Sequence, residues 1–100
     1  MPKQLEKIKS RIRSLLIKNG IKKAGIFGSY ARGDYKRGSD IDILIKAPKD
    51  FSLFDVAGLE ISLEKVLGKK VDLLTYNSLN SLLKERILKE EIRILWKKII

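Results

Sequence analysis

Residues 28–46 read GSYARGDYKRGSDIDILIK, and the rest of the chain can be interpreted as a scaffold for this stretch. In residues 40–46 isoleucines alternate with Asp40, Asp42, Leu44 and Lys46, which predicts a β-strand. The period of two places Asp40 and Asp42 on the same face, about 6.6 Å apart at Cα. At the other end, Gly28-Ser29 follows the apolar run 24–27 and predicts a tight turn. Such a turn exposes backbone N–H groups and a hydroxyl, which suit a phosphate.

Outward from this stretch, the apolar spacing predicts an alternation of helices and strands. The predicted elements are a helix at 3–18, strands at 24–27 and 40–46, a helical turn at 30–33, a helix from Ser52 to about Leu67, a strand at 70–75, and a helix capped by Ser78 or Asn80. Residues 91–96 fit an edge strand or a continuation of the last helix, and we favour the strand. The helix after Ser52 has apolar residues beyond a single stripe, including Phe54 and Ile61, so we expect it to be well buried. The order indicates an α/β sheet covered by helices, in one domain spanning residues 1–100.

The composition limits the chemistry. The chain has no cysteine and no histidine, which excludes thiolate or imidazole metal sites and histidine acid–base catalysis. A metal would have to be held by oxygen, as Mg²⁺ and Mn²⁺ are. No apolar run approaches the length of a membrane span and the N-terminus does not resemble a signal peptide, so we expect a cytoplasmic protein without a membrane partner.

The formal charge of +10 comes from 22 Lys and Arg against 12 Asp and Glu. It is typical of a protein that meets a nucleotide, a nucleic acid or an acidic partner protein, and equally of a thermophile surface. The basic amphipathic helix at 3–18 could lie on a membrane or on RNA, but packing against its own sheet is the favoured interpretation.

The aspartates carry the strongest chemical signal. Asp40 and Asp42 repel each other unless a cation lies between them, and a divalent ion would serve, as would Arg32, Arg37 or Lys46. Asp72 interrupts the apolar run of the strand at 70–75, where an unpaired charge is costly. It could complete a site with three carboxylates of the kind that binds two metal ions. It could equally pair with Lys69 or Lys70, or face solvent.

Gly28-Ser29, ten further residues and then Asp40-Ile41-Asp42 resemble the signature of the DNA polymerase β-type nucleotidyltransferases. The fuller pattern, Gly-Ser-Tyr-Ala-Arg-Gly followed by Ser-Asp-Ile-Asp-Ile, is similar to the minimal nucleotidyltransferases (MNT), the MntA-like antitoxin partners of HEPN toxins. This resemblance covers nearly the whole chain. It implies a polymerase β palm-like fold, with a small mixed β-sheet flanked by helices.

The resemblance also implies an activity, the transfer of AMP from ATP to a tyrosine of a cognate HEPN toxin. Asp40 and Asp42 would bind two Mg²⁺ ions, with Mn²⁺ as an alternative, and Asp72 would ligate the catalytic metal and help deprotonate the acceptor. Gly28 and Ser29 would hold the β- and γ-phosphates, and Ser39 is assigned to nucleotide binding with them. Arg32 would contact phosphate or brace the loop against a carboxylate, and bracing is favoured.

Three functions remain open from the sequence. The first is an active AMP transferase. The second is a catalytically silent nucleotide-binding antitoxin that neutralises its partner by binding alone. The third and weakest is a basic nucleic-acid-binding module, which the absence of an aromatic-rich basic platform disfavours. The apolar C-terminus (Leu95, Trp96, Ile99 and Ile100) could dock a partner or a second copy of the chain, or Trp96 could simply cap the core.

Overall fold

The computed structural model describes residues 3–96 and contains one four-stranded sheet in the order β3-β2-β1-β4. Strand β1 (Lys23–Phe27) is antiparallel to both β2 (Ile41–Ile45) and β4 (Ile92–Trp96), whereas β3 (Val71–Thr75) is parallel to β2. The predicted small mixed sheet with flanking helices is therefore confirmed. Residues 91–96 also form the favoured edge strand rather than a longer helix.

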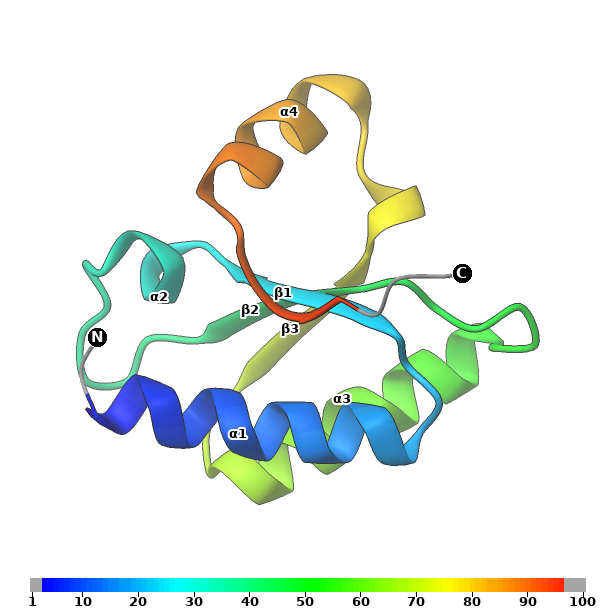
Figure 1. The fold of residues 1–100 in the computed structure, drawn as a ribbon, viewed down its shortest axis with the longest axis horizontal. Coiled ribbons are helices and arrows are strands. Elements are labelled where there is room, and N and C mark those ends of the chain that lie inside the picture. Colours follow the sequence, from blue (N-terminus) through cyan, green and yellow to red (C-terminus); the bar gives the residue numbers. More distant parts are fainter. Residues whose placement is uncertain (1–2, 97–100) are drawn as a thin grey trace.

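Helices α1 (Lys3–Lys18) and α3 (Leu53–Leu67) lie on one face of the sheet, and α4 (Ser81–Glu90) lies on the other (Figure 1). The core lies between the sheet and the first two helices. Its fully enclosed side chains are Ile12, Leu16, Ile21, Ile26, Ile41, Ile43, Ile45, Leu63 and Val71. Because the apolar stripe of α1 is buried here, the favoured interpretation of the basic helix is confirmed: it packs on its own sheet.

The sequence boundaries of α3 are confirmed, but its predicted burial is wrong. Ser52 and Asp55 form a capping box at its start, and Gly68 ends it. Yet only Leu59 and Leu63 are buried along the helix, while Phe54 remains 88% exposed. The position of α3 explains this exposure, because the helix lies along the outer edge of the sheet rather than beneath its centre.

Two glutamates of α3 show where the helix sits. The carboxylate of Glu64 accepts the backbone N–H of Val71 at 3.0 Å, and that of Glu60 accepts the N–H of Leu73 at 2.9 Å. Strand β3 is an edge strand, so these N–H groups have no strand partner on that side. The glutamates satisfy the open edge, and the positions of α3 on its far side therefore face solvent.

Helix α4 begins after Asn80, whose side chain accepts the N–H of Leu83, so Asn80 rather than Ser78 is the cap. Ile87 is its buried residue. At the end of the described chain Leu95 is buried and Trp96 is 38% exposed, while Ile99 and Ile100 lie outside the described residues. Among residues 3–96, no helix combines the length and the apolar character needed to cross a membrane.

Candidate active site

The Gly28-Ser29 turn connects β1 to the short helix α2 (Ser29–Arg32), as predicted. Gly28 has a positive φ of 72°, and its carbonyl accepts the N–H groups of Ala31 and Arg32. A Cβ atom at residue 28 would overlap the carboxylate of Asp42. Glycine is thus required twice, by the backbone conformation and by the close approach of Asp42. The turn and the aspartate form one unit although fourteen positions separate them in sequence.

Asp42 and Asp72 meet through the parallel pairing of β2 and β3. They are direct partners in the register, and Phe27 of β1 pairs with Asp42 on its other side. The side chains of directly paired residues lie on the same face of a sheet, and here that face is the one opposite α1 and α3. Residues 41, 43, 71 and 73 point the other way into the core. Within each of these five-residue strands, alternate side chains therefore enter the core or lie on the face that carries the two aspartates.

The electrostatics of Asp42 reflect this crowding. Its pKa is raised to about 6, chiefly by burial, then by the charge and hydrogen bond of Asp72 and by the charge of Asp40; Arg32 acts in the opposite direction. Within residues 3–96, no cation forms an ion pair with Asp40, Asp42 or Asp72. The salt bridges considered as alternatives from the sequence are thus not formed. Two carboxylates in contact, short of positive charge, are a suitable environment for a divalent cation.

The fit to a metal ion is partial as the side chains lie. Over the range 3–96, no group of three or more carboxylates converges closely enough to hold an ion together. Asp42 and Asp72 are in contact, whereas Asp40 precedes β2 and acts on Asp42 through its charge. Mg²⁺ is commonly bound by only one or two carboxylates together with substrate phosphates. The oxygen-only donor set therefore fits Mg²⁺ if phosphates supply further ligands. The roles of Asp40, Asp42 and Asp72 as metal ligands stay predictions.

Arg32 connects α2 to α4. Its Nε donates to Asp34 and one terminal nitrogen donates to Glu90, each at 3.2 Å. These two bonds, with Asp34 first, raise the pKa of the guanidinium. The contacts are those of a brace, the favoured interpretation, and binding of nucleotide by Arg32 stays a prediction. Sequence reasoning missed Glu90, since a helix-surface glutamate 58 positions away gives no local signal.

Ser39 closes the turn that leads into Asp40. The backbone N–H of Lys36 donates to the Ser39 hydroxyl at 2.8 Å, and the Ser39 N–H donates to the Lys36 carbonyl at 2.9 Å. The hydroxyl thus stabilises the loop before β2. Its assignment to nucleotide binding stays a prediction, as do those of Gly28 and Ser29.

A second polar cluster on the same face was not anticipated. The Tyr76 hydroxyl donates to Glu91, whose side chain is only 3% exposed, and Arg93 lies 4.0 Å from the same carboxylate. Burial, and then the Glu91 carboxylate, raise the pKa of Tyr76. A Cβ at Gly25 would overlap the Glu91 side chain. That glycine in the middle of a predicted strand was the available signal, because such a glycine often marks a close approach.

Comparison with known proteins agrees with this geometry. A model of the nucleotidyltransferase domain matches residues 5–95. A Methanocaldococcus jannaschii chain, named for protein adenylyltransferase activity, is 52% identical over 91 residues, covering 91% of this chain and 98% of its own length. The protein adenylyltransferase MntA of Thermococcus cleftensis is 40% identical over 75% of this chain and 76% of its own length.

A solved structure agrees as well. One chain of a crystal structure of a toxin–antitoxin with AMP-PNP superposes with a TM-score of 0.80 at 26% identity, covering 90% of this chain and 74% of the other. The chain belongs to the nucleotidyltransferase-domain family, to which the Gly28-Ser29 turn and its aspartates had pointed.

Proposed function

We propose that this chain is a Mg²⁺-dependent protein adenylyltransferase that transfers AMP from ATP to a protein hydroxyl. The proposed acceptor is a tyrosine of a cognate HEPN-type toxin, so that the chain acts as the antitoxin of the pair. The observation that carries the proposal is the direct pairing of Asp42 with Asp72, with the Gly28 turn against the Asp42 carboxylate. The protein adenylyltransferase names of the relatives and the toxin–antitoxin with AMP-PNP support it.

In this mechanism the Gly28-Ser29 turn binds the β- and γ-phosphates through backbone N–H groups and the Ser29 hydroxyl. Because the N–H groups of Ala31 and Arg32 already bond to the Gly28 carbonyl, the amides of Ser29 and Tyr30 are the ones proposed to meet the phosphates. Asp40, Asp42 and Asp72 would hold Mg²⁺, which supplies neutralisation of the charge that develops on the phosphates. Arg32 keeps α2 in place through its bonds to Asp34 and Glu90.

The acceptor hydroxyl attacks the α-phosphorus of ATP. A new O–P bond forms, the bond from the α-phosphorus to the bridging oxygen breaks, and pyrophosphate leaves. The hydroxyl proton passes to a carboxylate, for which Asp72 is proposed because it is the more exposed member of the pair. Positioning and electrostatics suffice for this displacement, so the absence of histidine and cysteine from the chain is no obstacle.

The test is transfer of label from α-labelled ATP to the purified product of the gene adjacent to this chain's gene, which the proposal expects to be a HEPN-type toxin. We expect label on the partner in Mg²⁺, located on a tyrosine by mass spectrometry, and none in EDTA. Asp42→Asn should abolish labelling, and the exposed Asp50→Asn is the matched control with the same change in charge. Full labelling by Asp42→Asn would show that the site is assigned wrongly.

One observation favours a second candidate, the catalytically silent nucleotide-binding antitoxin. No three carboxylates converge in the part of the chain that the structure describes. Such a protein would neutralise its partner by contact alone. Neutralisation of the toxin that survives Asp40→Asn combined with Asp42→Asn would favour this candidate, whereas its loss, with binding retained, would favour the transferase.

A further inference from the structure

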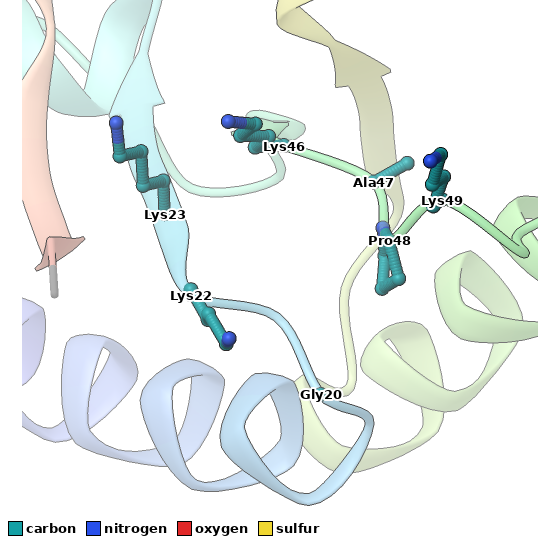
Figure 2. Close-up of a pocket in the computed structure, with 7 residues that line it drawn as sticks. All are labelled: Gly20, Lys22, Lys23, Lys46, Ala47, Pro48 and Lys49. Atoms are coloured by element: carbon teal, nitrogen blue, oxygen red, sulfur yellow. The ribbon is translucent and has the colours of Figure 1, made fainter. Parts of the chain in front are cut away.

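A pocket surrounded by lysines lies at the opposite end of β2 from Asp40. It has a volume of about 330 Å³ and lies between the start of β1 and the loop that follows β2 (Figure 2). Four of its seven lining residues are lysines, and none is acidic; the lining consists of Gly20, Lys22, Lys23, Lys46, Ala47, Pro48 and Lys49. Lys46 lies four residues after Asp42 along the same extended segment, so the Cα atoms of these two residues are about 13 Å apart.

The lysines of this pocket lack negative partners. Within residues 3–96, no carboxylate forms an ion pair with Lys22, Lys46 or Lys49, and the ammonium of Lys23 lies 4.9 Å from the centre of the Trp96 ring. The Lys46 N–H donates to the Lys23 carbonyl at 3.0 Å, which places these residues side by side. In Figure 2 the side chains of Lys23 and Lys46 extend toward the same side, whereas that of Lys22 points the other way. Like charges facing each other on paired strands repel, and an anion between them would relieve this repulsion.

Two large exposed apolar side chains follow the pocket closely in the sequence, four and five residues after Lys49. Leu53 is 87% exposed and Phe54 is 88% exposed, in the first turn of α3. A turn in which the Phe51 N–H donates to the Pro48 carbonyl connects the pocket to this helix. The capping box fixes the start of the helix, so the apolar pair is held on a rigid element that begins within a few residues of the basic pocket.

We propose that this basic pocket and the adjacent Leu53-Phe54 pair form a docking site for an acidic amphipathic segment of a partner protein. A second copy of this chain is a poor occupant, because each copy carries a net charge of +10. A free polyphosphate would use the lysines and leave both apolar side chains in water. RNA could stack a base on Phe54, but Leu53 offers it nothing. Acidic and apolar side chains on one segment would complement the entire surface.

The test is a titration of the ¹⁵N-labelled protein followed by NMR, in EDTA so that the carboxylate site plays no part. The probe is a short synthetic helix of Glu and Leu with one apolar stripe, compared with single-stranded RNA and with tripolyphosphate. We expect the peptide to shift the amides of residues 20–23 and 46–54. Removing three lysines together, Lys22→Ala, Lys46→Ala and Lys49→Ala, should weaken peptide binding about tenfold or more.

Two further variants separate the contribution of the apolar pair from that of the net charge. Leu53→Ser with Phe54→Ser should weaken the peptide to a similar degree while leaving tripolyphosphate binding unchanged. The matched control removes three exposed lysines elsewhere, Lys7→Ala, Lys65→Ala and Lys84→Ala, and should change peptide affinity less than threefold. Equal weakening by the control would show that only net charge matters and would overturn the proposal. Tighter binding of RNA or tripolyphosphate at these amides, or no peptide-induced shift there, would also overturn it.

Discussion

Asp42→Asn is expected to make the metal-free protein more stable at neutral pH, although it removes a proposed catalytic residue. The fold raises the pKa of Asp42 from 3.8 to about 6, through burial first and the neighbouring Asp72 second. A carboxyl group with a higher pKa in the folded state holds its proton more tightly when folded. Its contribution to stability is therefore complete below about pH 3.8 and is lost as the pH rises through about 6.

The magnitude follows from this shift in pKa. The difference between 3.8 and about 6 corresponds to about 3 kcal/mol for a fully buried group. Asp42 is only partly buried, and solvent screening reduces the penalty to about 1–2 kcal/mol. With a urea dependence of about 1 kcal/mol per molar for a small domain, Asp42→Asn should raise the urea midpoint at pH 7 by about 1–2 M.

The assay is urea unfolding followed by circular dichroism at several pH values, first in EDTA. The wild type should lose stability between about pH 4 and 7, and Asp42→Asn should lose markedly less over the same interval. Asp50→Asn, an exposed control, should behave as the wild type does. Mg²⁺ at about ten times its dissociation constant should then add about 1.4 kcal/mol to the wild type and much less to Asp42→Asn. An unchanged pH dependence in Asp42→Asn would refute the reasoning.

Three further predictions concern the supports of the site. Gly28→Ala should abolish transfer and should destabilise the fold by more than the backbone strain of about 1–2 kcal/mol that alanine has at positive φ. Gly33→Ala is the control: a Cβ there meets nothing within 4 Å, so only the backbone strain is expected. Equal losses of stability in the two variants would refute the close approach of Asp42 at residue 28. Tyr76→Phe should destabilise by about 1–3 kcal/mol in urea, because the buried Glu91 carboxylate loses its donor, and a double-mutant cycle with Glu91→Gln should show strong coupling. Arg32→Gln should speed amide exchange in residues 33–39, because the guanidinium is bonded to two carboxylates. The same variant should change the affinity for ATP, measured by calorimetry, less than threefold. A larger loss of affinity would indicate that Arg32 contacts phosphate directly.

Much of the local structure could be predicted because short-range patterns determine it. Alternation in residues 40–46 predicts β2, and the Ser52 and Asp55 pair predicts the first turn of α3. The same alternation predicts that Asp42 lies on the face opposite the isoleucines. These inferences depend only on residues that lie a few positions apart in the sequence.

What the sequence could not provide was the position of each element against its neighbours. Phe54 and Ile61 have the side chains of a buried helix, yet the edge position of α3 leaves them exposed. The glutamates that bond to β3 are equally compatible with a solvated helix face. Likewise, the partner of Arg32 and the burial of Glu91 depend on how α4 crosses the sheet. Asp72 could be singled out because it interrupts an apolar strand, but its position directly across from Asp42 depends on the strand order of the sheet.

The face of the sheet that carries Asp42 is polarised along its strands. Alternation places Leu44 and then Lys46 after Asp42, and the antiparallel neighbour runs from Lys23 to Phe27 beside them. Along β2, Asp42 therefore lies toward one end of this face, and Lys46 follows the strand at the other end with Lys23 beside it. The proposed acidic segment would be attracted to the lysine end and repelled by the carboxylates, which would orient it before close contact forms. A divalent cation held by the carboxylates would reduce the repulsion at the catalytic end, whereas the negative charge of ATP would offset that reduction. Binding of a divalent cation and docking of an acidic segment are therefore expected to be coupled through charge, with no conformational change required.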